Sequence, residues 1–141
     1  LWKSTGSESS AEREEFMKLW SAAEINRLTN IRASQNRKSG TPGPEGSISK
    51  LAMAELNKSI YSFAMNLLGA EGMLFDSYAM HQPKAALFGD DLHKNFLRAR
   101  ANSIEGGTTE VMKNILGERV LGLPGDIRMD KDLPWSKVPR N

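Results

Sequence analysis

The chain has no proline or glycine between Gly6 and Gly40, and apolar residues recur there at helical spacing. At 100° per residue they fall within an arc of about 120°, which is the width of a core-facing stripe. The residues in that arc are Phe16, Leu19, Trp20, Ala23 and Ile31. Ser9 precedes Glu12 by three positions, the spacing of a capping box at a helix start. The pattern predicts one long helix over residues 10–38.

A connector rich in glycine and proline, residues 40–46, separates this segment from a second apolar one. Proline lacks the backbone donor and glycine has excess backbone entropy, so the helix cannot continue through it. Ser47 offers a cap for a second helix, which Gly69 is suited to end. That helix is apolar on two faces, which predicts the middle of a bundle or a subunit contact. The faces consist of Ala52, Met53, Leu56, Ile60, Phe63 and Leu67, and of Leu51, Ala54, Tyr61, Met65 and Leu68.

Residues 70–89 give mixed signals and predict a loop with short helical turns at most. A third helix is expected from Asp90 or Asp91, carrying Leu92, Phe96, Leu97 and Ala101 and stopping by Gly106–Gly107. Thr108 or Thr109 caps a fourth, with Met112, Ile115, Leu116 and Val120 on one face and Gly122 and Pro124 closing it. No segment alternates at period two. We therefore predict an all-α four-helix bundle over residues 10–123, after a leader at 1–9 and before an extended tail at 124–141.

Composition excludes several classes of site. The 141 residues are 39% hydrophobic, so one domain can form a sizeable core without metal or disulfide. The absence of cysteine excludes disulfides, thiolate zinc sites and cysteine nucleophiles. Only His81 and His93 could supply imidazole, which leaves little for a histidine metal site or a serine triad.

The charge pattern argues against nucleic acid as a partner, because the formal charge is only +2 and the signs alternate along the chain. No apolar run approaches the ~18 residues of a membrane span. The first residues lack an initiator methionine and the apolar core of a signal peptide. We expect a piece of a longer, soluble, cytoplasmic protein.

The most chemically suggestive segment is residues 103–110, where Gly106–Gly107 leads directly into a helix start. Small residues allow close approach of a ligand, and a helix N-terminus favours an anion such as a pyrophosphate. A purely structural corner between helices fits the same residues. Arg27 and Arg119 fall within apolar arcs, where we expect intrahelical pairs or side chains that extend to solvent; Arg13 also falls within such an arc.

Several motifs, in order, closely resemble the carboxy-terminal helical domain of flavin-dependent acyl-CoA dehydrogenases. The resemblance covers about Arg13 to Pro124. The motifs are residues 42–47 followed by Lys50-Leu51, residues 67–72, and above all residues 104–110 continuing through 118–124.

The resemblance implies a full chain with an amino-terminal helical domain, a central β-barrel and this bundle, in which FAD lies between barrel and bundle. A neighbouring subunit's bundle also touches the FAD, in a homo-oligomer that is a dimer or a tetramer. The substrate would be an acyl-CoA, and electron-transfer flavoprotein or a similar protein would accept the electrons.

The resemblance also implies cofactor-binding residues. Arg13 and Phe16 match the family's Arg-x-x-Phe element, whose arginine reaches the FAD pyrophosphate, although Met17 stands where a glycine is usual. Asn66 stands where a glutamine is common, before a glycine turn in which Gly69 is kept and Ala70 replaces the second glycine. Thr108, Thr109 and Glu110 match positions that contact FAD at the start of the last helix.

The implied reaction is α,β-desaturation of an acyl-CoA thioester, in which a carboxylate removes the α-proton and the flavin accepts the β-hydrogen as hydride. Many members place the catalytic glutamate two residues before the threonine of this corner, where this chain has Gly106. Others keep the base on a different helix. Our hypothesis is that Glu105 is the base. A positive helix end would lower its pKa and burial against the substrate would raise it, so the direction of the shift stays open.

Two other functions remain open. One is a non-catalytic partner subunit or helical oligomerisation module in a mixed acyl-CoA dehydrogenase complex, which the altered positions Asn66, Ala70 and Gly106 suggest. The other is an unrelated basic helical adaptor for nucleic acid, which the interspersed charges support poorly. We expect the isolated chain to be catalytically inactive.

Overall fold

The computed structural model describes residues 9–41, 43–74, 91–125 and 133–138. Within these ranges there are four α-helices and no strand, so the predicted all-α class is confirmed. The helices are α2 (Ser10–Lys38), α3 (Glu45–Leu68), α4 (Leu92–Ala99) and α5 (Thr109–Arg119). Short 3-10 turns follow α3 (η1, Gly69–Met73) and α4 (η2, Arg100–Ser103), and a third lies in the tail (η3, Trp135–Lys137).

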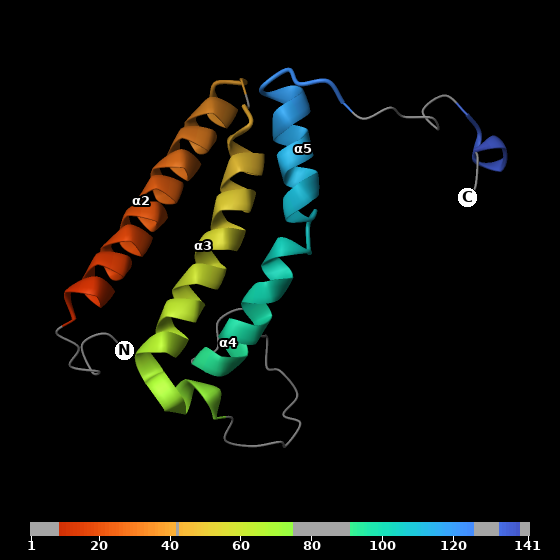
Figure 1. Cartoon of the computed structure of the whole chain (residues 1–141). Coiled ribbons are helices and arrows are strands. Elements are labelled where there is room, and N and C mark those ends of the chain that lie inside the picture. Colours follow the sequence, from red (N-terminus) through yellow and green to blue (C-terminus); the bar gives the residue numbers. More distant parts are fainter. Residues whose placement is uncertain (1–8, 42, 75–90, 126–132, 139–141) are drawn as a thin grey trace.

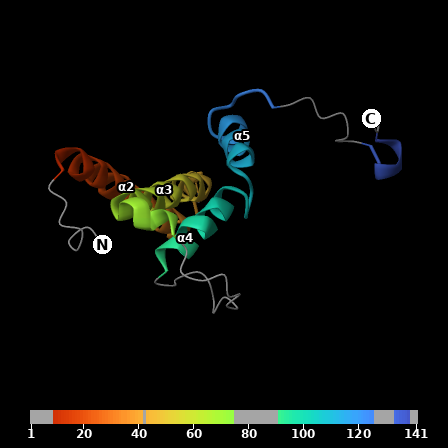
Figure 2. The ribbon, with the colours of Figure 1, turned by 60° about the horizontal axis from the view of Figure 1, so that its bottom comes forward.

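Helix α3 is the central element of the arrangement. It packs against α2 on one side and against α4, η2 and α5 on the other (Figure 1). Helices α4 and α5 follow one another along that second side and are joined by η2 and residues 104–108. Turned by 60°, the helices still lie side by side with α3 between α2 and α4 (Figure 2). Of the two alternatives predicted for the second helix, the structure shows the middle position.

Three of the four helix starts have side-chain caps, as expected from the sequence. Ser9 Oγ accepts from the amide of Glu12, and Asp91 Oδ1 accepts from the amide of Lys94 at 3.1 Å. Thr108 Oγ1 accepts from the amide of Val111 at 3.2 Å. These bonds satisfy amides that have no partner within their own helix.

The prediction that Ser47 caps the second helix is wrong. The helix begins two residues earlier, at Glu45, and Pro44 is its first flanking residue. The ring of Pro44 fixes φ at −76°, which suits a helix start, and its carbonyl accepts from the amides of Ser47 and Ile48 at 3.0 and 3.1 Å. Ser47 therefore lies inside the first turn. The end at Gly69, with φ 58°, agrees with the prediction.

The third helix is shorter than the sequence suggested. It begins at Leu92, as expected, but the α-helix ends at Ala99 and the chain tightens into η2. Polar side chains tie η2 to α3: Arg100 Nη2 donates to Ser62 Oγ at 3.0 Å, and Asn57 Nδ2 donates to Asn102 Oδ1 at 2.7 Å. We attribute the change of helix type to these contacts, since no glycine or proline occurs there.

The interface between α2 and α3 has a polar part near the connector. Ser49, which is buried, lies 2.9 Å from the side-chain oxygens of both Asn26 and Asn30. Closer to the other end of these helices the interface becomes an apolar groove of about 290 Å³. The groove is lined by Phe16, Leu19, Trp20, Ala23, Ile60, Phe63, Ala64 and Leu67.

The core is thin for a chain of this size. The buried apolar side chains in the described ranges are Ala54, Phe63, Ala64 and Ala99. No residue of α2 is buried, and Ile31, predicted for its core stripe, is exposed. Phe16 and Trp20 of the predicted stripe are exposed too, so this stripe is not the buried core face that the sequence predicted.

Several expectations lie outside the described residues: the leader at 1–8, most of the 70–89 loop with His81, and most of the tail. In the tail, residues 135–137 form the turn η3, where an extended chain was expected.

Candidate functional site

The candidate site is the corner between η2 and α5, formed by residues 104–108. Gly106 and Gly107 have φ values of 63° and 99°, in the left-handed region that side-chain-bearing residues rarely adopt. Two successive residues of this kind change the direction of the chain between the end of η2 and the cap of α5. The glycine pair is thus required by the local backbone geometry.

Glu105 is exposed and lies directly before this pair, and two side chains bind its carboxylate. Arg98 Nη2 from α4 donates to Oε1 at 3.0 Å and to Oε2 at 2.8 Å. Asn102 Nδ2 from η2 donates to Oε1 at 2.9 Å, and Asn102 is itself held by Asn57 of α3. The Arg98 hydrogen bond lowers the pKa of Glu105, so the carboxylate is anionic at neutral pH.

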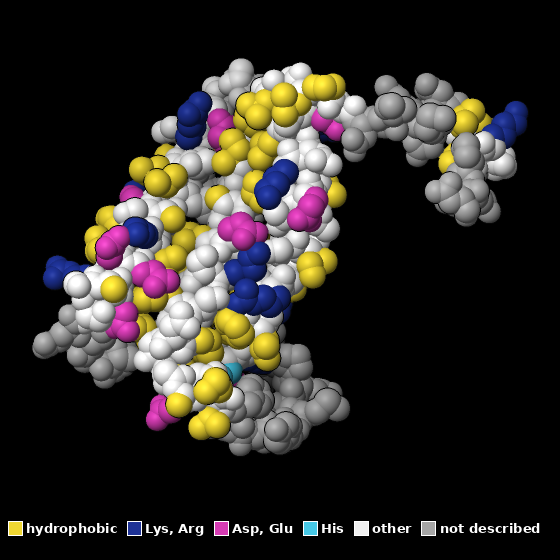
Figure 3. Space-filling view, in the orientation of Figure 1, with side chains coloured by type: hydrophobic (Ala, Val, Ile, Leu, Met, Phe, Trp, Pro, Cys, Tyr) yellow, Lys and Arg dark blue, Asp and Glu magenta, His cyan; other side chains and the backbone are white. Residues whose placement is uncertain are grey.

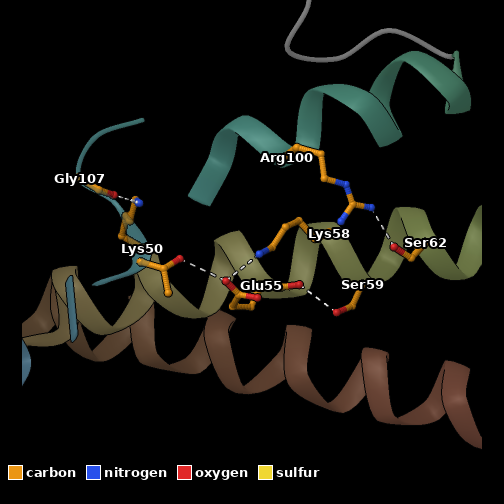
Figure 4. A network of polar contacts seen from close by, with 8 residues as sticks. Lys50, Glu55, Lys58, Ser59, Ser62, Arg100 and Gly107 are labelled. Atoms are coloured by element: carbon orange, nitrogen blue, oxygen red, sulfur yellow. Dashed lines mark hydrogen bonds and ion pairs between the residues drawn. The ribbon is translucent and has the colours of Figure 1, made fainter. Parts of the chain in front are cut away.

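Helix α3 holds the corner from its other side (Figure 4). Lys50 Nζ donates to the carbonyl oxygen of Gly107. Thr109 Oγ1 donates to Glu55 Oε1 at 3.3 Å, and Lys58 Nζ lies 2.8 Å from the same oxygen. The hydrogen bond from Lys58 lowers the pKa of Glu55. Charged side chains of both signs accordingly gather over this part of the molecular face (Figure 3).

At the start of α5, some of the free backbone amides already donate hydrogen bonds to side chains of this chain. Thr108 Oγ1 accepts a hydrogen bond from the amide of Val111. A hydrogen bond from the backbone amide of Glu110 to its own carboxylate lowers the pKa of Glu110. A phosphate at this helix start would have to compete with both.

The other predicted cofactor residues form a second group. Arg13 and Phe16 lie on the first turns of α2, and Asn66 and Gly69 lie at the end of α3. These ends are neighbours, because the ring centroids of Phe16 and Phe63 are 6.4 Å apart. Asn66 is eleven residues from Glu55 along α3, which is about 16 Å at 1.5 Å per residue. The structure therefore brings Arg13, Phe16, Asn66 and Gly69 to one end, well away from Glu105 and residues 108–110.

Sequence reasoning missed the residues that hold the corner: Arg98, Asn102, Asn57, Glu55 and the contact of Lys50. Lys50 stood inside a recognised motif, but no role followed from it. The link from Lys50 to Gly107 spans 57 residues, and the link from Asn57 to Asn102 spans 45. Helical spacing carries no signal for such pairs.

The other two charged residues considered from the sequence, Arg27 and Arg119, do not contact the corner. Arg27 forms the predicted intrahelical pair, with its Nε 2.8 Å from Glu24 Oε2. Arg119 is exposed and lines a groove with Pro44 and Ser47. Among the described residues, no three or more His, Asp or Glu side chains are grouped to hold a metal ion. No helix in the described ranges has both the length and the apolar character needed to cross a membrane.

Comparison with known proteins gives the family. The profile of the acyl-CoA dehydrogenase carboxy-terminal domain matches residues 4–121. The acyl-CoA dehydrogenase IpdE1 of Mycobacterium tuberculosis is 28% identical over 116 residues, which are 82% of this chain and 28% of that protein. IpdE1 of Mycolicibacterium smegmatis is 26% identical over 116 residues, or 82% of this chain and 26% of that protein.

The chain thus spans about a quarter of the length of these curated relatives. No solved structure is significantly similar to it. Because the profile covers most of the chain, and because the helical fold agrees with that domain, the chain belongs to the acyl-CoA dehydrogenase family, as its carboxy-terminal domain.

Proposed function

We propose that the complete protein is an FAD-dependent acyl-CoA dehydrogenase that desaturates an acyl-CoA thioester between its α and β carbons. The observation that carries the proposal is the family match over residues 4–121, which includes the glycine corner. FAD would accept the β-hydrogen as hydride. A homo-oligomer and electron-transfer flavoprotein as acceptor are parts of the same proposal.

Two exposed glycines leave room beside the backbone for a cofactor such as FAD. Gly69 and Gly106 are exposed, and an added Cβ at Gly69 would meet nothing within 4 Å. At Gly106 the nearest atom would be Lys50 Cε, at 4.0 Å. A ligand can therefore approach the backbone closely at both places.

We propose that the two groups of residues serve two different cofactor molecules of the oligomer. Residues 108–110 would contact the FAD of their own subunit, and Arg13, Phe16, Asn66 and Gly69 that of a neighbour. Their separation along α3 supports this division.

Glu105 is the proposed base. Its carboxylate is exposed, so a thioester can reach it, and its pairing with Arg98 keeps it deprotonated, as a base must be before it accepts the α-proton. The same pair lowers its affinity for that proton. Covering the carboxylate with the acyl chain removes water and raises its pKa, which opposes the effect of Arg98.

The test uses the full-length protein. It should carry FAD, visible by its absorbance, and an acyl-CoA of suitable chain length should bleach the flavin. Glu105→Gln should retain FAD but lose bleaching, whereas Glu118→Gln, on the far part of α5, should bleach like the wild type. Bleaching by Glu105→Gln at the wild-type rate would remove Glu105 from the role, and a full-length protein without FAD would contradict the proposal itself.

One observation favours a second candidate, a non-catalytic subunit of a mixed complex. Gly106 stands where many family members carry the base, and Glu105 is engaged by Arg98 and Asn102. Full-length protein that retains FAD and is bleached without a partner chain would exclude this candidate.

A further inference from the structure

The corner contains two successive glycines with positive φ, and these two residues have no side chains that could hold them in place. Glycine loses more conformational freedom on ordering than any other residue. A fixed position for Gly106 and Gly107 therefore requires contacts from outside the turn. Helix α3 supplies one such contact, from Lys50.

We propose that Lys50 is a positioning residue that fixes the Gly107 carbonyl, and with it the glycine corner, against α3. The inference rests on the proposed function, in which this corner borders the flavin and the thioester. Lys50 Nζ donates to the Gly107 carbonyl oxygen across 57 residues (Figure 4). Lys50 Cε is also the nearest atom to a Cβ added at Gly106, at 4.0 Å.

The arrangement differs from that of a surface lysine. Lys50 is half-buried and follows directly after Ser49, which is buried and bonded to α2. The root of the lysine side chain is thus anchored by the packing of α2 on α3. A charge-assisted bond from an anchored donor to a backbone carbonyl is stronger than a neutral one, which suits the task of holding a turn.

Lys50 also acts on the carboxylate beside the corner. Its positive charge contributes to the lowered pKa of Glu105, after the larger effects of Arg98 and Asn102. One ammonium group therefore fixes the backbone of the corner and favours the anionic form of the proposed base.

The experiment compares three variants of the full-length holoenzyme. Lys50→Met removes the donor and keeps most of the stem, Lys50→Arg keeps a cationic donor, and Lys18→Met removes an equal charge from an exposed pair on α2. Hydrogen–deuterium exchange of the peptide covering residues 104–110 is measured alongside peptides of α2 and α5. FAD content, KM and kcat are measured on the same samples.

We expect exchange at residues 104–110 to be about tenfold faster in Lys50→Met, as for the loss of one hydrogen bond. Lys50→Arg should restore most of the protection, and Lys18→Met should leave it unchanged. We also expect a lower kcat in Lys50→Met, with FAD content and KM near the wild-type values.

Unchanged exchange at 104–110 in Lys50→Met would overturn the proposal. Acceleration spread equally over α2 and α5 would also overturn it, because Lys50 would then act on general stability. The exchange result does not depend on turnover. If the full-length protein binds no FAD, the proposed function fails, while the exchange measurement still decides whether Lys50 holds the corner.

Discussion

Asn36 Nδ2 donates a 2.6 Å hydrogen bond to Oε1 of Glu45, a carboxylate buried where α2 and α3 meet at the connector. Arg32 adds a longer contact of 3.5 Å from an exposed side chain. A buried carboxylate that loses a donor keeps its desolvation cost.

Asn36→Leu should therefore lower the free energy of unfolding by about 1–3 kcal/mol. Its matched control is the exposed neighbour Gln35→Leu, expected to change stability by less than about 0.5 kcal/mol. Urea unfolding followed by circular dichroism measures both. Equal effects of the two substitutions would contradict a special role for the Asn36–Glu45 bond.

The Arg98–Glu105 pair should give a pH dependence of defined sign. The pKa of Glu105 is lowered from its ordinary value of 4.5, chiefly by the Arg98 hydrogen bond. The contribution of the pair to stability is therefore complete above pH 4.5 and is lost as the pH falls through the lower, folded-state value. Carbon-detected NMR titration of the Glu105 carboxyl should give a midpoint below 4.5 in the wild type and a higher one in Arg98→Met. The same midpoint in both proteins would show that Arg98 does not control the group.

Gly107→Ala should destabilise the protein. A left-handed backbone costs an alanine roughly 1–2 kcal/mol, and the added Cβ would lie 2.6 Å from Met112 Cε, so that side chain must move. Gly46→Ala, in the first turn of α3 with nothing near the added atom, should be neutral or slightly stabilising. Thermal unfolding separates the two, and a Gly107→Ala protein as stable as Gly46→Ala would refute the backbone argument.

The 141-residue chain should self-associate, because α2 exposes large apolar side chains. Trp20, Ile25 and Leu28 are 56%, 65% and 53% exposed. Exposed apolar patches of this kind favour association. Sedimentation should show a concentration-dependent increase in mass that Leu28→Glu reduces. Ser34→Glu, which adds the same charge at an exposed polar position of α2, should leave it unchanged, and a monomer at all concentrations would contradict the prediction.

The long first helix could be predicted from the sequence because its limits are set locally, by the Ser9 cap and the first glycine after it. The start of α3 could not, since Ser47 and Pro44 both offer a start and the proline, with its fixed φ, begins the helix earlier. The end of α4 depends on contacts of Arg100 and Asn102 with α3. The spacing of apolar residues along the sequence does not indicate such contacts between helices.

The candidate site was predictable in part for the same reason. Two adjacent glycines before a threonine indicate a corner and a helix cap, and both are present. The residues that hold the corner come from other helices, so only the fold brings Lys50 and Arg98 to it. The partner of Glu105 also decides the direction of its pKa shift, which the sequence left open.

Because α3 is central, two consecutive residues of this helix contact elements on its two opposite sides. Ser49 is hydrogen-bonded to α2. Lys50, the next residue, is hydrogen-bonded to the turn on the opposite side of α3. A single peptide bond of α3 therefore separates the contact with α2 from the contact with that turn.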